Sequence, residues 1–271
     1  MNDLDYRLSL RCLFETWQST QTLGETLTEA EWKTATACPG WSVQDNLSHI
    51  IGTERALGGL GGNEHKAKNL EHAKNPIGEM NEHQVDARRH LSGAQVLNEF
   101  KEIVVLRKSF LETAPENYFT DETMTPMGKA PMANFLSIRA MDCWVHEQDI
   151  RRAINKPGNQ VSLCAELSVD RLCRTLPMVV GKRAKAPEGS VSVVKITGPV
   201  QRNIMITVKD GRAAVIESSD VAPIVEIEFD SNVFIELATG RATSDQLREK
   251  IKNVGDVALG ERVVGALNMM I

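Results

Sequence analysis

The spacing of the apolar residues changes once along this 271-residue chain, and no other feature limits the fold as strongly. Up to about residue 180 the apolar residues recur every three or four positions, which is the period of an amphipathic helix. Residues 224–229 (IVEIEF) instead alternate apolar with acidic side chains, as a half-buried strand does. A basic stretch that contains proline and glycine, residues 182–189, separates the two patterns. We therefore predict a helical domain over residues 1–181 and a small α+β domain over residues 186–271.

Local start and stop signals place the helices of the first domain. Ser42 is a typical N-cap residue, and Asp45 three positions later completes a capping-box pattern. The sequence Lys156-Pro157-Gly158 ends the last long helix of this region. Two stretches interrupt the helical pattern: residues 58–65, which contain four glycines, and residues 126–131, which contain two prolines and a glycine. The predicted helices cover residues 4–17, 43–57, a segment beginning near 92, 133–154 and 162–180.

The second domain combines strands with short helices. Asp210-Gly211 is a strong signal for a tight turn between two strands. The predicted strands are residues 191–197, 203–209, 212–217 and 224–229. Helical patterns follow at residues 231–239, 243–251 and 256–270.

Composition and charge exclude several classes of function. The net charge of −5 and the pI near 5.8 argue against a nucleic-acid surface, which requires a basic stripe. No run approaches the roughly 18–20 apolar residues that span a bilayer, so no membrane partner is expected. The acidic start, MNDLDYRLSL, lacks an apolar signal core, and five widely spaced cysteines without a C-x-x-C suit reduced thiols. We expect a cytoplasmic protein, a monomer or homodimer, whose cysteines are structural.

Residues 136–154 of the predicted helix 133–154 include charged side chains where apolar ones are expected. On a helical wheel one side, which we interpret as the solvent face, holds Glu147, Gln148, Arg151 and Arg152. The middle of the opposite, buried arc holds Arg139, Asp142, His146 and Asp149. Ionised groups on a buried line cost several kcal/mol each, as an order of magnitude, unless they are paired or coordinated.

Two explanations fit this buried line. Asp142 and His146 are four residues apart, so their side chains lie on one face and can converge on a metal ion, as in metal-binding helical bundles. The alternative is a salt-bridge network, Arg139 with Asp142 and Asp149 with His146, that fixes helix register. His49 is the obvious third ligand because it lies mid-helix in VQDNLSHII, at the border of the apolar face. A histidine in that place can also be a core-edge residue bonded to a carbonyl.

Several blocks of the sequence resemble one protein family. Residues 36–52, TACPGWSVQDNLSHIIG, resemble the C-P-G-W-[ST]-V-x-D-x-x-x-H-x-x-G signature of the mycothiol-dependent maleylpyruvate isomerase family. Residues 85–100 and 139–158 resemble later helices of the same family, which belongs to the DinB-like metal-binding four-helix bundles. Residues 229–241 and 254–271 are similar to the sterol-carrier-protein-like domain often attached to these bundles.

The resemblance implies a fold, a metal site and a reaction class. The fold is a DinB-like four-helix bundle over residues 1–181, followed by a small α+β sterol-carrier-protein-like domain over residues 186–271. The family's metal ligands fall on His49, Asp142 and His146, and three protein ligands with an open position suit a catalytic divalent metal, with zinc the expected ion. The thiol co-substrate is mycothiol, and its thiolate attacks a small electrophile, either as an S-transferase or as a cis–trans isomerase.

One residue departs from the family pattern. The isomerase itself has a glutamate where this chain has Asp142, which is shorter by one methylene. We therefore expect thiol transfer, or isomerisation of another substrate, in preference to efficient maleylpyruvate isomerisation.

Three further residues are candidates for supporting roles. Arg139 and Arg88 are expected to orient an anionic substrate or the thiol, with a structural ion pair as the alternative. Asp149 is expected to orient a histidine ring or an arginine rather than to bind metal.

Two rival functions remain open. One is a metal-dependent hydrolase or non-haem iron oxygenase, and the other is a non-catalytic ligand-binding or regulatory metalloprotein.

Overall fold

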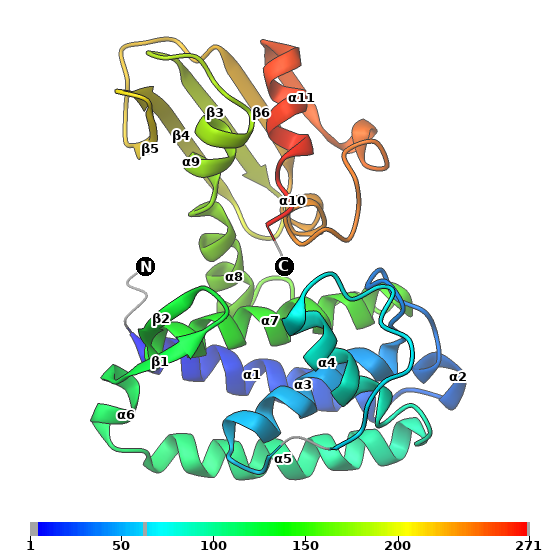
Figure 1. The fold of residues 1–271 in the computed structure, drawn as a ribbon. Helices are drawn as coiled ribbons and strands as arrows, with labels where there is room; N and C mark the ends of the chain where they lie inside the picture. The colour runs from blue at the N-terminus through cyan, green and yellow to red at the C-terminus, as the bar shows by residue number, and fades with distance from the viewer. Residues whose placement is uncertain (1–4, 62–63, 270–271) are drawn as a thin grey trace. The chain divides into compact units, whose positions relative to one another are not determined.

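The computed structural model describes residues 5–61 and 64–269. They form two compact units, of which the first ends at Leu167 and the second begins at Ser168 (Figure 1). The first unit is helical and the second contains a five-stranded sheet, so the predicted fold class is confirmed. Within the described ranges, no helix has the length and apolar character needed to cross a membrane. All five cysteines lie in these ranges, are buried and form no disulfide.

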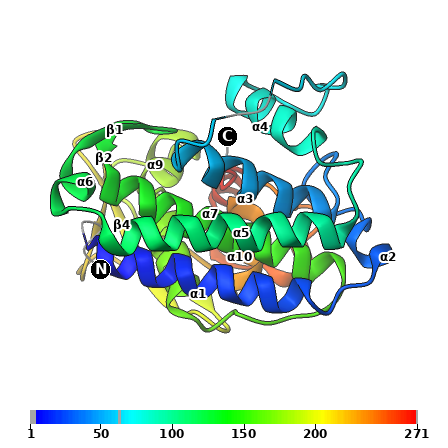
Figure 2. The ribbon, with the colours of Figure 1, turned by 90° about the horizontal axis from the view of Figure 1, so that it is seen from below.

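Four long helices make up the first unit. They are α1 (Tyr6–Gly24), α3 (Val43–Leu57), α5 (Gly93–Thr113) and α7 (Met132–Ala153). Figure 2 shows them running side by side, and contacts join α1 to α7 and α5, and α3 to α5 and α7. Their shared core is mostly apolar and includes Leu47, Ile50, Val96, Phe100 and Leu136.

Capping boxes mark the start of two of these helices. The Ser42 side chain accepts a hydrogen bond from the Asp45 backbone N–H, and the Asp45 carboxylate accepts one from the Ser42 backbone N–H. Ser92 forms the same reciprocal pair with Gln95 at the start of α5. These caps satisfy backbone donors that the first helical turn leaves unpaired. The predicted start of α3 at Ser42 is confirmed.

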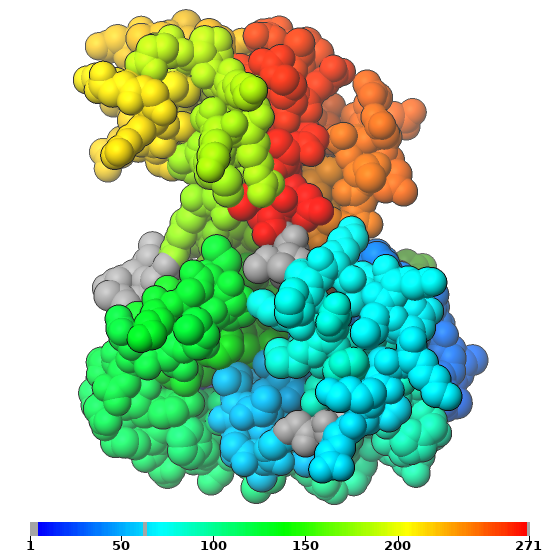
Figure 3. All heavy atoms as spheres, in the orientation of Figure 1, coloured from blue at the N-terminus to red at the C-terminus, as the bar shows by residue number. Residues whose placement is uncertain are grey.

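Short elements connect the long helices. They are α2 (Glu29–Trp32), α4 (Pro76–Asp86), α6 (Glu116–Thr120) and the hairpin of β1 (Glu122–Thr125) with β2 (Gly128–Pro131). The sequence did not predict α4, because only Glu82 and Val85 of its side chains are buried and its apolar periodicity is weak. In the space-filling view α4 and the loop before it, drawn in cyan, cover part of the bundle surface (Figure 3).

Helix α7 has no broad solvent face, which corrects the sequence interpretation. Glu147 is 0% exposed and Gln148 only 2%, although the helical wheel predicts both on the solvent face. The helix packs against both α1 and α3, so most of its circumference is covered. The Glu147 carboxylate is satisfied there by Ser19, Arg151 and Asn159, which donate hydrogen bonds of 2.6–2.7 Å. A polar pattern alone did not reveal this burial, because the partners lie on other segments.

The second unit is built on one mixed sheet. The strand order is β5 (Arg212–Ile216), β4 (Arg202–Lys209), β3 (Val191–Thr197), β6 (Val225–Asp230) and β7 (Lys252–Gly255). Strands β3 and β6 are parallel and the other neighbours are antiparallel. Helices α10 (Ser231–Ala238) and α11 (Val257–Gly265) pack on β6. The turn at Asp210-Gly211 joins β4 to β5 as predicted, with positive φ at both residues.

The elements around the unit boundary are α8 (Leu163–Cys173), α9 (Leu176–Met178) and the π-helical turn η1 (Val179–Arg183). A helix predicted over residues 243–251 is wrong. That segment holds only a 3₁₀ turn, η2 (Arg248–Lys250), and leads directly into β7, which pairs with β6. Only Leu247 of residues 243–251 is buried, so the segment has no apolar face whose packing would stabilise a helix.

Limited proteolysis tests the predicted boundary between residues 181 and 186. Lys182, Arg183 and Lys185 are exposed, so trypsin is expected to cut there, or in the glycine-containing loop 58–65, before other sites. A fragment of residues 1–180 is expected to stay helical by circular dichroism, because its four-helix core contains the contacts that stabilise it. Complete loss of structure in that fragment would show that the two units share one core.

Candidate metal centre

The structure brings the three predicted ligands together. His49 comes from the middle of α3, and Asp142 and His146 come from successive turns of α7. The Nε2 atom of His49 is 3.2 Å from Asp142 Oδ2, and the Nε2 atom of His146 is 3.6 Å from Asp142 Oδ1. One donor atom from each residue lies within 4.8 Å of the others. The i,i+4 spacing on α7 provides two donors, and the packing of α3 on α7 provides the third.

Burial and neighbouring charges set the protonation of these three groups. Burial lowers the pKa of His49, so this ring is neutral. Burial raises the pKa of Asp142, but Arg139 and the two histidines outweigh it and hold the pKa well below its usual value. Burial lowers the pKa of His146, while the Asp142 carboxylate more than compensates and raises it well above normal. The site therefore contains an ionised carboxylate between a neutral imidazole, His49, and an imidazole that keeps its second proton, His146, until an ion displaces it.

The donor set fits a divalent metal ion. Two imidazoles and one carboxylate, with an open fourth position, are the protein ligands of several catalytic zinc sites. The Nδ1 atom of His49 is buried and has no hydrogen-bond partner among the described residues, so no structural hydrogen bond through that atom explains why this ring is buried. His146 is oriented from behind, because its Nδ1 lies 2.7 Å from Asn46 Oδ1 and 3.4 Å from Asp149 Oδ2. Such partners direct the opposite nitrogen, Nε2, toward a ligand position.

Two of the three predicted supporting residues contact the ligands. Arg139 Nη1 is 2.5 Å from Asp142 Oδ2, and Asp149 contacts His146 as well as Arg152, whose Nη2 lies 2.6 Å from Asp149 Oδ1. The two ion pairs of the salt-bridge alternative are thus present. They use Asp142 Oδ2 and His146 Nδ1, and they leave Asp142 Oδ1 and His146 Nε2 facing each other.

Arg88 is not brought to the ligands. Its Nε and Nη2 atoms donate to the two carboxylate oxygens of Glu99 at 2.8 and 2.7 Å, and its Nη1 donates to the Gln84 carbonyl. This is the structural ion pair that the sequence left as the alternative for Arg88.

The structure adds Cys38 to the centre, which the sequence interpretation had treated as structural. Its thiol is 3.2 Å from Asp149 Oδ2, 3.5 Å from Asn46 Oδ1 and 4.0 Å from His146 Nδ1. Cys38, His146 and Asp149 form a second buried group of potential ligands. The sequence offered one signal for this role, because Cys38 lies only four residues before the Ser42 cap of α3. In the structure, the bridge between Ala35 and Ser42 folds this turn back toward the helix.

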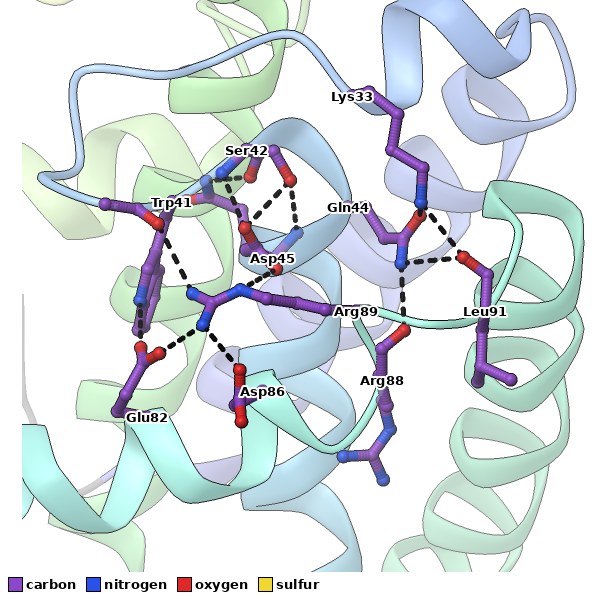
Figure 4. A network of polar contacts seen from close by, with 12 residues as sticks. Lys33, Trp41, Ser42, Gln44, Asp45, Glu82, Asp86, Arg88, Arg89 and Leu91 are labelled. Carbon is purple, nitrogen blue, oxygen red and sulfur yellow. Dashed lines mark hydrogen bonds and ion pairs between the residues drawn. The ribbon is translucent and has the colours of Figure 1, made fainter. Parts of the chain in front are cut away.

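Trp41 forms a wall of the site. Its ring centroid is 5.2 Å from that of His49 and 5.7 Å from that of His146. The indole Nε1 donates to Glu82 Oε2 at 2.9 Å, and Arg89 also contacts this carboxylate (Figure 4). Arg89 further reaches Asp45 on α3, so α4 is held against the turn that carries Trp41. Glu82, 1% exposed, fixes the tryptophan in place.

Comparisons with known proteins identify a family and a fold. The family model described as the mycothiol maleylpyruvate isomerase N-terminal domain matches residues 13–151. The crystal structure of the mycothiol-dependent maleylpyruvate isomerase is similar over 93% of this chain and 95% of that chain, with a TM-score of 0.58 and 16% sequence identity. A histidine-to-alanine mutant of that isomerase gives a TM-score of 0.57, 15% identity and the same coverage. No curated protein sequence matches the chain.

A further solved structure, the apo form of sterol carrier protein 2 from Yarrowia lipolytica, matches 41% of this chain and 93% of its own, with a TM-score of 0.30 and 13% identity. The isomerase structures show the fold of both units, since they cover nearly the whole chain. The family match spans more than half of the 271 residues and includes His49, Asp142 and His146. This protein therefore belongs to the mycothiol maleylpyruvate isomerase N-terminal domain family.

Proposed function

We propose that this protein is a metal-dependent enzyme that uses mycothiol as its thiol co-substrate and directs the sulfur to a small electrophile. The observation that supports this most directly is the buried group of His49, Asp142 and His146, which lies inside the segment matched by the family. The expected ion is zinc, because a site of two imidazoles and one carboxylate suits it. When bound, such an ion lowers the pKa of a thiol and favours the thiolate.

The chain's own residues supply the rest of the environment. Trp41 packs its apolar ring beside the two imidazole rings. Asp142 is the most exposed of the three, with 16% of its side chain accessible against 7% for each histidine, so substrates reach the centre past this carboxylate. Asn46 and Asp149 hold a proton on His146 Nδ1, so that Nε2 is the nitrogen that would lose its proton and donate its lone pair when an ion binds.

Two outcomes are open to the sulfur after it attacks carbon. In a transfer, the new C–S bond is kept and a leaving group departs with the bonding electrons, or a proton adds to the neighbouring carbon. In a cis–trans isomerisation, the sulfur adds to one carbon of a double bond, the resulting single bond rotates, and the sulfur leaves again with its electrons. The neutral thiol releases its proton before the attack in both cases. We propose thiol transfer, or isomerisation of another substrate, over maleylpyruvate isomerisation.

Turnover assays with mycothiol test this function. Protein loaded with zinc is expected to consume the thiol or isomerise a substrate in a panel of small electrophiles that includes maleylpyruvate, and the His49→Ala variant is expected to lose that activity. His90→Ala is a matched control, because this histidine is exposed and lies outside the cluster. Turnover that needs metal but no thiol would contradict the proposal and favour a hydrolase or oxygenase.

A further inference from the structure

A fully buried glutamate joins the three helices around the site. Glu54, on the last turns of α3, is 0% exposed. Its Oε1 accepts from Arg139 on α7, whose Nε and Nη2 atoms are both 3.0 Å away. Its Oε2 accepts from Nε of Arg107 on α5 at 3.1 Å. One carboxylate thus connects α3, α5 and α7, and we refer to Arg107, Glu54 and Arg139 as the Arg–Glu–Arg triad.

The triad continues to a predicted metal ligand. Arg139 is 3% exposed, and its third nitrogen, Nη1, lies 2.5 Å from Asp142 Oδ2. Every nitrogen of this guanidinium is therefore engaged: Nε and Nη2 with Glu54, Nη2 also with Cys143 Sγ at 3.4 Å, and Nη1 with Asp142. A planar guanidinium held at all three nitrogens has a single orientation. Asp142 Oδ2 also lies 3.2 Å from His49 Nε2, and Asp142 Oδ1 lies 3.6 Å from His146 Nε2.

Stability alone does not explain the triad. Arg107 is 2% exposed, its Nη1 makes only a 3.4 Å contact with the Leu57 carbonyl, and its Nη2 has no hydrogen-bond partner among the described residues. Burying charged groups has a large desolvation cost, and apolar side chains of similar volume are often as stable or more stable. What apolar side chains cannot provide is a fixed direction for Arg139. The arrangement resembles the outer partners that orient metal-binding groups in many proteins.

We infer that the Arg–Glu–Arg triad positions Asp142, because its hold on Oδ2 fixes the direction in which the carboxylate faces the two histidines. Glu54 is the central positioning residue, and Arg107 fixes Glu54 from the far side. The inference rests on the proposed function, since it concerns the same metal site. It gives positioning roles to Arg139, Glu54 and Arg107. The sequence predicted a supporting role only for Arg139.

Metal affinity measured by competition with a chromophoric chelator tests the inference. Glu54→Gln keeps the shape of the side chain but removes its charge, and it is expected to weaken zinc binding by about 10–100-fold. Cobalt substituted for zinc is expected to show an altered visible absorption spectrum in this variant, because the carboxylate reorients. A role in stability alone would not change the spectrum of the folded protein. Glu99→Gln is the matched control: it disrupts the Arg88–Glu99 pair, away from the ligands, and is expected to leave affinity and spectrum unchanged.

A second variant covers the case in which Glu54→Gln does not fold. Arg107→Met keeps the Glu54–Arg139–Asp142 contacts and removes only the outer arginine, and a smaller but measurable loss of zinc affinity is expected. Folded variants that bind zinc and cobalt like the unaltered protein would overturn the inference while leaving the proposed function intact. If the unaltered protein binds neither ion, the proposed function itself fails, and the inference fails with it.

Discussion

Protein purified without chelator is expected to contain close to one zinc ion, or a similar first-row divalent ion, per chain, and each ligand variant is expected to lose most of it. The variants are His49→Ala, Asp142→Ala and His146→Ala. Each removes one of three donors that lie within 4.8 Å of one another. The loss of affinity is expected to exceed the roughly 10–100-fold that follows from removing an outer partner of a metal ligand. Elemental analysis of dialysed protein measures the metal content.

Thermal unfolding gives an independent measure of the same site. An ion that binds only the folded chain stabilises it by about 2.7 kcal/mol at a free concentration 100 times the Kd. Added zinc is therefore expected to raise the Tm of the unaltered protein and of His90→Ala, and not that of the ligand variants. Unchanged metal content in all three ligand variants would show that the ion, if present, binds elsewhere.

Lengthening Asp142 by one methylene is expected to keep the metal and change the substrate preference. In Asp142→Glu the carboxylate is displaced by about 1.5 Å, one carbon–carbon bond, and the 2.5 Å contact of Oδ2 with Arg139 must rearrange. Asp142 is the most exposed of the three predicted ligands, so moving its carboxylate is expected to change the room for an electrophile. We expect the ratio of kcat/KM values for isomerisation and thiol transfer to shift about tenfold toward isomerisation, which corresponds to about 1.4 kcal/mol between the two transition states.

Steady-state kinetics on both reactions, with elemental analysis alongside, measure this effect. Asp245→Glu adds the same methylene to an exposed aspartate of the second unit and serves as the control. Robust, mycothiol-dependent maleylpyruvate turnover by the unaltered protein would contradict the expectation. It would mean that the spacing of α3 and α7 already compensates for the shorter side chain.

Features that depend on neighbouring residues were predictable from the sequence. The start of α3 follows from the Ser42–Asp45 capping box, in which both partners lie within one helical turn. The convergence of Asp142 and His146 follows from the helical repeat, because residues four apart always share a face. The change of period after residue 180 likewise predicted the second, sheet-containing unit.

Features that depend on packing between distant segments were decided only by the tertiary structure. Glu54 and Arg139 are 85 residues apart, and Cys38 and Asp149 are 111 apart, so no local spacing predicts either contact. The burial of Glu147 and the pairing of β7 with β6 have the same origin, since the groups that make them favourable belong to other elements. The sequence alone determined which donors lie on one face of α7, because the helix repeat is fixed by backbone geometry. Which helix supplies the third donor, and which charges surround all three, depends on how α3, α5 and α7 pack, and side-chain complementarity between helices sets that packing only in the folded chain.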